Sequence, residues 1–319
     1  MHKEYPKCFS IKSKENLILS DSSSGGFFTV IATYVIQNKG IVYGAVYDDN
    51  FQVIHEGIDA IDELYRMRGS KYVQSKQGDC FSDIKAELEK DRLVLYTGTS
   101  CQVAALKAYL GKEYENLITA DIICHGVPSP RLWKAYLEFQ EKKHNSKLVN
   151  AKFRDKYYGW LNYSMLLTFQ NGKIYRKKVQ DDPYMRMFLQ NGFLRPCCYE
   201  CRFKSLSKPS DFTMSDHWKV RHSCPEFDDD KGTSLLFCNN SKSIILLQSI
   251  SPLLMCKEIT IEQALYENPA VTKASQRPSN RCQTFPLLDT EPFLKVYKQT
   301  CVPLWRDKYR RLKLKLKGI

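Results

Sequence analysis

The sequence contains no long hydrophobic run. Its longest apolar stretch covers only residues 27–36, whereas a helix that spans a bilayer needs about 20 apolar residues. The first residues also lack the apolar core of a secretory signal. These two absences argue against an integral membrane protein and a secreted protein, so the sequence predicts a cytoplasmic location.

Cysteine is too scarce for a disulfide scaffold. There are 12 cysteines among 319 residues, well below the roughly 8–10% that marks small disulfide-rich domains. In the reducing cytoplasm such thiols stay free. We expect some of them in the hydrophobic core, including Cys238 and Cys256, which lie in apolar runs.

Neither an internal repeat nor a low-complexity linker interrupts the chain. Its length suits one large or two modest domains. We expect an α/β region over residues 1–150, a region with a cysteine turn over 151–290 and a basic tail over 291–319.

The alternation of apolar and polar residues predicts a mixed α/β core, with functional loops at the strand ends and an added β-hairpin and cysteine-turn region. Asn171-Gly172 between two alternating runs is the hairpin signal. We expect helices over 27–37, 62–68, 82–90, 102–110, 129–143, 183–190 and 244–250, and strands over 41–46, 52–55, 93–96, 117–123, 163–169, 173–179 and 234–238.

Acidic residues are fewer than basic ones, and the formal net charge is +13. Much of this excess lies in the C-terminal tail, where lysine alternates with leucine after Trp305. Such a tail suits an anionic membrane surface or an acidic partner, and a merely solvated tail is the alternative. The tail is therefore a candidate contact to the inner membrane surface.

The cysteine turn around Cys197, Cys198 and Cys201 is the most informative stretch of the chain. A Cys-x-x-Cys turn points two thiolates at one metal or cluster, and soft thiolates favour zinc or iron–sulfur. His217 and His222 follow at zinc-finger spacing, and with the basic charge this suggests a nucleic-acid-binding finger. The spacing by itself leaves zinc and iron–sulfur both open, because residues 210–216 alternate like a strand.

Three loops could also take part in chemistry. Residues 22–26 (Ser-Ser-Ser-Gly-Gly) precede a helix and could cradle a phosphate, although they match no established phosphate motif and suit an ordinary helix cap equally well. Residues 97–101 and 124–126 follow expected strands, at the sheet edge where ligands bind in open α/β sheets. Cys101 and Cys124 could therefore converge with the cysteine turn, and two isolated buried cysteines are the alternative.

Taken in order, these loops resemble the coenzyme F420-reducing hydrogenase/dehydrogenase beta-subunit family over residues 22–278. The blocks that carry the resemblance are 22–29, 68–75, 97–102, 121–130, 198–203 and 210–218. The resemblance implies a flavoprotein that holds FAD in its N-terminal region and a [4Fe-4S] cluster shared between the two regions. It also implies that electrons pass between the flavin and the cluster.

The resemblance also implies roles for individual residues. The implied cluster ligands are Cys101, Cys124, Cys198 and Cys201. Side-chain chemistry, rather than the resemblance, makes Lys71 a candidate to stabilise negative charge on the flavin and His125 a candidate to move protons, and a structural role is the alternative for each. The implied cofactor-binding residues are Ser23, Ser24, Gly25, Gly26, Ser70, Lys71, Tyr72, Thr97, Gly98, Thr99, His125 and Gly126. The family pattern has an aromatic residue at His217, which favours iron–sulfur over zinc.

The chain departs from the family pattern in ways that affect its partners. Many relatives carry an N-terminal ferredoxin-like segment, where this chain has only Cys8, so the expected partner is a separate ferredoxin-like electron carrier. Ser100 and Ser215 replace a family proline and glycine, which puts the deazaflavin substrate in doubt. Similar members tend to accompany surface-polysaccharide genes. The alternative to an iron–sulfur flavoprotein is a zinc-stabilised basic protein that binds nucleic acid or an acidic partner and has no redox activity. For the iron–sulfur flavoprotein itself, nucleic acid is not an expected partner.

Overall fold

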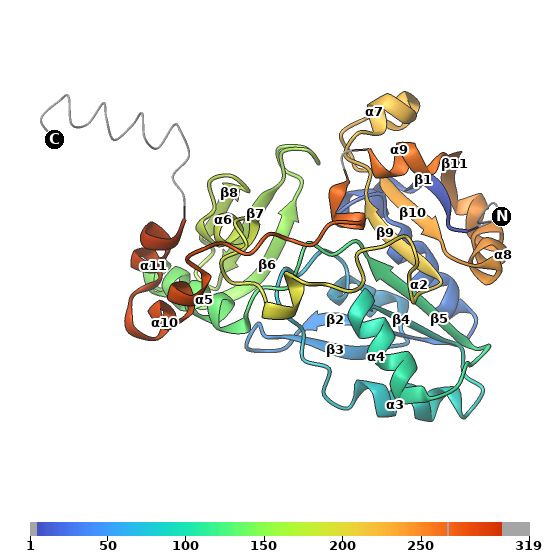
Figure 1. The fold of residues 1–319 in the computed structure, drawn as a ribbon, viewed down its shortest axis with the longest axis horizontal. Coiled ribbons are helices and arrows are strands. Elements are labelled where there is room, and N and C mark those ends of the chain that lie inside the picture. Colours follow the sequence, from blue (N-terminus) through green and yellow to red (C-terminus); the bar gives the residue numbers. More distant parts are fainter. Residues whose placement is uncertain (1–4, 267, 302–319) are drawn as a thin grey trace, which may run out of the picture.

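The computed structural model describes residues 5–266 and 268–301, which form two sheets covered by helices (Figure 1). The basic tail expected after Trp305 lies outside the described residues. In spatial order the larger sheet consists of β11 (Leu254–Ile259), β1 (Lys7–Ser13), β10 (Ser234–Cys238), β9 (Phe212–Asp216), β5 (Leu117–Ile122), β4 (Val94–Thr99), β2 (Ile41–Tyr47) and β3 (Val53–Ile58). The smaller sheet consists of β6 (Leu148–Asp155), β7 (Ser164–Phe169) and β8 (Ile174–Lys178). This architecture confirms the mixed α/β fold class expected from the sequence.

The middle of the larger sheet is parallel. Strands β2, β4, β5 and β9 run in the same direction, while β3 is antiparallel to β2. On the other side β10 is antiparallel to β9, and β1 is antiparallel to both β10 and β11. The carboxyl ends of β1, β2, β4, β5 and β9 therefore meet at one edge.

Helices cover both faces of the larger sheet. Consecutive residues of β4 separate the two layers, since Leu95 packs with α2 (Phe27–Gln37) and α8 (Ser241–Ile250), and Val94 and Tyr96 pack with α3 (Cys80–Leu88) and α4 (Ser100–Leu110). Near-continuous apolar strands such as β4 are typical of a sheet buried on both faces. Three shorter helices also belong to the part of the chain around the larger sheet: α1 (Asn16–Asp21), α7 (Val220–Ser223) and α9 (Ile261–Leu265).

The smaller sheet packs against its own group of helices, which lie together at one end of the molecule in Figure 1. These are α5 (Pro130–His144), α6 (Pro183–Leu189), α10 (Arg281–Thr290) and α11 (Phe293–Thr300). Helix α5 begins as expected, with Ser129 as N-cap and Pro130 in the first turn. The expected hairpin also forms, and Gly172 takes the positive φ of 79° that its turn requires.

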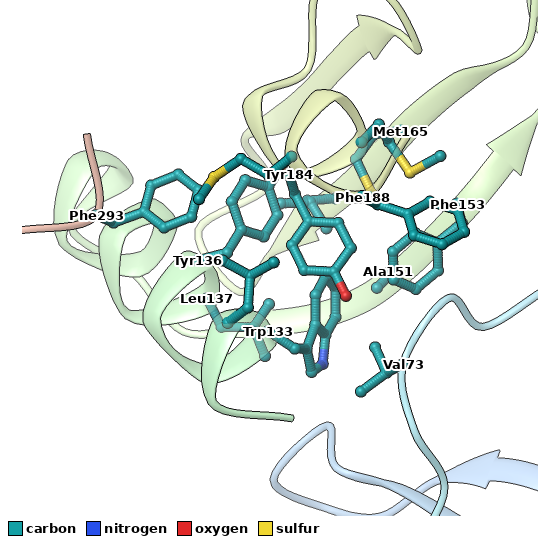
Figure 2. Packing of buried hydrophobic residues seen from close by; sticks show 14 of the residues in the cluster. Val73, Trp133, Tyr136, Leu137, Ala151, Phe153, Met165, Tyr184, Phe188 and Phe293 are labelled. Atoms are coloured by element: carbon teal, nitrogen blue, oxygen red, sulfur yellow. The ribbon is translucent and has the colours of Figure 1, made fainter. Parts of the chain in front are cut away.

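An aromatic core fills the space between this sheet and its helices (Figure 2). The ring of Trp133 lies 4.9 Å from that of Phe153 and 5.2 Å from that of Tyr184. The indole Nε1 of Trp133 donates a hydrogen bond of 2.7 Å to the carbonyl oxygen of Phe51, in the turn between β2 and β3. Trp133 thus ties the smaller unit to the larger sheet.

Several elements differ from the sequence-based expectation. The segment expected as a helix over 62–68 is a 3₁₀ helix, Ile61–Arg66, with no side-chain cap at its start. Strands β1, β6 and β11 were not expected, because their sequences are rich in polar residues. Lys12 is buried in β1 and pairs with Asp229 at 2.7 Å, so a charged residue occupies an interior strand. Cys238 is buried as expected, but Cys256 is exposed because it lies on the edge strand β11.

The described residues contain no helix with both the length and the apolar composition that a membrane crossing demands. All 12 cysteines fall within the described residues and are free thiols, as expected.

Truncating Trp133 tests how much the aromatic core stabilises the fold. Trp133→Ala should lower the free energy of unfolding by about 3–5 kcal/mol, because it leaves a cavity among packed rings and removes the bond to Phe51. Urea unfolding followed by far-ultraviolet circular dichroism measures this change. Ile245→Ala is the control, since Ile245 is 63% exposed on α8 and its loss should change stability by less than about 0.5 kcal/mol. Equal effects of the two substitutions would contradict the stabilising role of Trp133 in the aromatic core.

Candidate functional site

The candidate site is built on the edge where the parallel strands end. Thr99 ends β4, Ile122 ends β5 and Asp216 ends β9, while Tyr47 ends β2. Because these strands are parallel, the loops after them leave the sheet on the same side, which is where open α/β sheets bind ligands. The expected loops 97–101 and 124–126 therefore lie at one edge.

Cys101 lies in the first turn of α4. Thr99 and Gln102 form a reciprocal capping box, in which the backbone nitrogen of Thr99 donates to Oε1 of Gln102 at 2.9 Å. The hydroxyl of Thr99 also lies 3.1 Å from the Sγ atom of Cys101. The sulfur of Cys101 is therefore exposed at the N-terminal turn of α4, directly after the end of β4.

Gly126 brings the Cys124 loop against the cysteine turn. A Cβ atom on Gly126 would lie 2.7 Å from Cδ1 of Leu194 and 3.4 Å from Cβ of Cys198, and its φ is +144°. The backbone nitrogen of Arg195 donates to the carbonyl oxygen of Val127 at 3.0 Å, which holds the two segments together. Glycine is required here by the close approach of the two segments.

The expected cluster ligands influence one another electrostatically. Burial raises the pKa of the Cys124 thiol to about 12; Lys204 opposes this shift, and the nearby thiols of Cys198 and Cys101 add to it. Burial also raises the pKa of Cys198, and the nearby thiols of Cys101 and Cys201 raise it further. The four expected ligands therefore share one neighbourhood, on three separate segments of chain.

The gathered thiols do not form a closed metal site in this conformation. Within the described part of the chain, no three His, Cys, Asp or Glu side chains have the geometry to hold a metal ion. The chemistry of the donors nevertheless fits a soft centre, because four thiolates are the usual ligands of a [4Fe-4S] cluster or a structural zinc.

Two lysines that the sequence analysis did not identify lie beside these thiols. Lys204 Nζ donates hydrogen bonds to the carbonyl oxygens of Cys124 and Ala270. Lys208 Nζ donates to the carbonyl oxygen of Phe203 at 2.6 Å. Their positions three and seven residues after Cys201 were the signal available in the sequence.

His125 is held in one orientation. Its Nε2 lies 2.6 Å from Oδ1 of Asn191, whose amide nitrogen donates to the carbonyl oxygen of Gln276 at 3.1 Å. This assigns the proton to Nε2 and leaves Nδ1 as an acceptor. Burial lowers the pKa of His125, and the charge of Lys204 adds to this effect, so the ring is neutral near pH 7.

The histidines of the zinc alternative have other partners. Nδ1 of His217 lies 3.0 Å from the Ser10 hydroxyl and Nε2 lies 2.9 Å from that of Ser223. Burial lowers the pKa of His217 to about 4. The ring of His222 packs on the ring of Tyr266. His217 thus has no free nitrogen for a metal in this structure.

A cavity of about 670 Å³ opens beside this edge, between the larger sheet and strand β6. Its volume is typical of small-molecule sites, which range over roughly 300–1,000 Å³. The walls come from the loop after β1, the turn between β2 and β3, the segment 65–71 and residues 149–155.

Three of the expected flavin-binding residues line this cavity: Ser23, Ser70 and Lys71. The backbone nitrogen and the hydroxyl of Ser70 lie 2.7 and 3.0 Å from Oγ of Ser23, which joins two segments far apart in sequence. Burial lowers the pKa of Lys71 to about 7. Its Nζ donates to the carbonyl oxygens of Met67 and Arg68 at 3.3 Å.

The rest of the serine-glycine loop serves the fold. The Ser24 hydroxyl donates to the carbonyl oxygen of Thr233, and Gly25 N donates to Oγ of Ser234. A Cβ atom on Gly25 would lie 2.4 Å from the carbonyl oxygen of Ile11, so this glycine is required by the adjacent strand. Gly26, with φ +87°, precedes the first turn of α2. Direct cofactor contacts by Ser24, Gly25 and Gly26 stay predictions.

The remaining expected residues lie at or behind this edge. The carbonyl oxygen of Thr97 contacts Nε2 of His55, and Gly98 packs against Gln102. The ring of Tyr72 stacks on that of Phe188 at 4.8 Å. Phe188 also meets the ring of His125 edge-on at 5.0 Å. A continuous set of rings therefore joins the segment beside the cavity to the cysteine loops.

Tyr47 and Arg154 also line the cavity, and neither was predicted as a site residue from the sequence. Arg154 pairs with Asp216 at the end of β9, and Trp160 Nε1 donates to the other carboxylate oxygen at 3.2 Å. The guanidinium lies over the ring of Trp218 at 4.9 Å. The sequence carried no signal for this, because the arginine and its carboxylate are on strands of different sheets.

The comparisons with known proteins agree with this architecture. Residues 91–262 match the sequence model of a family described as the carboxy-terminal part of the coenzyme F420 hydrogenase/dehydrogenase beta subunit. A chain of the F420-reducing [NiFe] hydrogenase complex from Methanosarcina barkeri, solved with xenon derivatization, has a similar fold. It aligns with a TM-score of 0.55 and 16% identity over 86% of this chain and 96% of that one. None of the curated proteins matches the chain. Since the family match spans more than half of the sequence, the chain belongs to the coenzyme F420 hydrogenase/dehydrogenase beta-subunit family.

Proposed function

We propose that this chain is an iron–sulfur flavoprotein that binds FAD in the cavity and one [4Fe-4S] cluster at the gathered thiols, and passes electrons between them. Family membership supports an oxidoreductase role. The observation that carries the finer proposal is the row of ring contacts from Tyr72 through Phe188 to His125. Tyr72 follows Lys71 of the cavity wall, and His125 follows Cys124, one of the expected cluster ligands.

In this proposal Cys101, Cys124, Cys198 and Cys201 hold the cluster. A cluster with four thiolate ligands carries negative charge, and nearby cations and hydrogen bonds to sulfur stabilise it. Lys204 and Lys208 provide the cations, and the Thr99 hydroxyl provides a bond to one sulfur.

FAD, when bound, can exchange two electrons in single steps with a one-electron centre. In this proposal the hydroxyls of Ser23 and Ser70 and the ammonium of Lys71, which belong to the cavity wall, bind its polar groups. Lys71 contributes a positive charge against anionic oxygens of the cofactor. His125 can accept a proton at Nδ1, because Asn191 holds the Nε2 proton.

The proposed redox partner is a separate ferredoxin-like carrier. A similar fold in a multi-subunit hydrogenase complex supports partners of this kind. Contact with a membrane surface or an acidic partner through residues 305–319 stays a prediction outside the described residues, and a role in surface-polysaccharide synthesis stays a prediction from the resemblance.

Iron analysis of anaerobically purified protein tests the cluster. Wild-type protein should contain about four iron atoms per chain. Cys198→Ser should abolish the cluster absorption, whereas Cys256→Ser should retain it, because Cys256 is exposed on the distant edge strand β11. Stoichiometric zinc without iron, after reconstitution has been attempted, would contradict the proposal.

The pH dependence of FAD binding tests Lys71. Its pKa of about 7 in the unliganded protein means that it is charged below and neutral above this pH. The pyrophosphate of FAD keeps its charge from pH 6 to pH 9, so the affinity for FAD should fall as the pH rises through 7, by about tenfold or more for one charged hydrogen bond. Lys71→Met should bind FAD weakly at pH 6 with a flat profile, as measured by titration calorimetry. If the affinity of the wild-type protein for FAD does not change with pH, Lys71 does not bind the flavin.

A further inference from the structure

Basic side chains gather around the expected cluster ligands. Three segments contribute to this region: residues 122–127 at the end of β5, residues 191–208 around the cysteine turn, and residues 268–281 between α9 and α10. We call them together the basic surface. They contain one acidic residue, Glu200, and seven basic ones: Arg195, Arg202, Lys204, Lys208, Lys273, Arg277 and Arg281.

Hydrogen bonds hold the three segments of the basic surface together. Nζ of Lys204 donates to the carbonyl oxygens of Cys124 and Ala270. Nη2 of Arg281 donates to the carbonyl oxygen of Leu194 at 2.9 Å. Figure 1 shows the third segment crossing from the larger sheet to the helices of the smaller unit. The basic residues are therefore neighbours of the cysteines, although they come from parts of the chain far apart in sequence.

The charges of the basic surface are not neutralised within the protein. Among the described residues, none of the seven cations forms an ion pair with a carboxylate. Lys208 has only a longer-range attraction to the buried Asp121. Arg195, Arg202 and Lys273 are exposed to solvent. The basic surface therefore presents unpaired positive charge to whatever approaches the thiols.

The thiols beside these cations reach the surface of the molecule. Cys101 and Cys197 are exposed, and the side chain of Ile122, at the end of β5, is 42% exposed. Transient redox complexes have small interfaces, and interfaces in general combine an apolar core with a polar rim. Exposed sulfur atoms and an apolar side chain, next to unpaired cations, suit an interface of this kind.

The sign of the charge and the kind of exposed side chain indicate the class of partner. Unpaired cations steer an acidic protein towards the surface that bears them. A single-stranded nucleic acid is also anionic, but its binding sites use exposed aromatic rings on which bases stack. Of the described large apolar side chains that are exposed, only that of Ile122 belongs to the basic surface, and it is not aromatic. An acidic protein is therefore the better match.

We propose that the basic surface is the docking site of an acidic protein that carries single electrons, and that this carrier approaches the cluster site over Cys101 and Cys197. The inference rests on the proposed function, because it assigns a surface to the carrier proposed there. The same cations that stabilise a negatively charged cluster then also attract the carrier.

Neutralising three exposed cations tests the docking site. The probe is a purified acidic [4Fe-4S] ferredoxin, and its dissociation constant with anaerobically prepared full-length protein is measured by biolayer interferometry at low and high salt. The triple variant Arg195→Gln, Arg202→Gln and Lys273→Gln should bind it about tenfold more weakly at low salt, because one exposed ion pair contributes a factor of roughly two to five. The difference should shrink at high salt, which screens exposed charges.

A matched control removes three cations from the opposite edge of the larger sheet. Lys39, Lys90 and Lys112 are exposed and precede β2, β4 and β5, so they lie where these parallel strands start. The triple variant Lys39→Gln, Lys90→Gln and Lys112→Gln changes the net charge by the same amount. It should alter the affinity for the ferredoxin by less than about twofold, because these charges are distant from the docking site and screened by salt.

Glu200 provides a test in the opposite direction. It is exposed between Cys198 and Cys201 and is the one acidic residue of the basic surface. Glu200→Gln removes its repulsion of an acidic carrier, so the affinity for the ferredoxin should increase by about twofold or more. A gain in affinity does not result from misfolding, so this variant tests the docking site even if the triple variant is unstable.

Iron and flavin contents of the same samples separate this inference from the proposed function. Affinities of the triple variant and of Glu200→Gln that equal that of the control overturn the docking site, whatever the cofactor content. Ferredoxin binding that depends on these charges, in protein that holds zinc and no iron, upholds the docking site and overturns the iron–sulfur flavoprotein. A single-stranded DNA oligonucleotide that binds the wild type as tightly as the ferredoxin does, and loses affinity in the triple variant, identifies a nucleic-acid surface and overturns the proposal.

Discussion

The parallel hydrogen bonding of β2, β4, β5 and β9 decides where the chemistry of this protein can lie. Parallel neighbours must start and end at the same edges, so the segments after Tyr47, Thr99, Ile122 and Asp216 leave the sheet together. The positions of Cys101 and Cys124, and of the cavity wall that follows β2, depend on this one constraint. The cysteine turn, which belongs to no strand, reaches the same place because Gly126 allows it to approach.

Buried charge connects the smaller sheet to the larger one. Arg154 of β6 pairs with Asp216 of β9, and Lys156 donates to the carbonyl oxygens of Leu19, Ser24 and Lys231. Taking such cations out of water is costly unless each finds an acceptor. The position of β6, and therefore the shape of the cavity, depends on these pairings.

The two halves of the candidate site could be anticipated from the sequence to different degrees. Cys198 and Cys201 are recognisable as candidate ligands by their spacing. Cys101 and Cys124 are recognisable because each lies in a loop directly after a predicted strand. The cavity had no such signal, because its walls come from loops and strands far apart in the chain. Gly25 illustrates the difference: its sequence context suggested a phosphate loop, whereas its neighbours are the backbone of β1 and β10.

Local interactions determined what the sequence by itself could predict. The apolar runs of β4 and β5, the Ser129-Pro130 helix start and the Asn171-Gly172 turn each depend on residues close together in the chain, so pattern and turn chemistry were enough. Only the tertiary structure decided that the polar strands β1 and β6 are interior or cavity-lining elements, since Lys12 finds Asp229 and Arg154 finds Asp216 across long separations. From the sequence alone a charged residue is expected to be exposed. Only the folded structure brings it next to the partner that allows it to be buried.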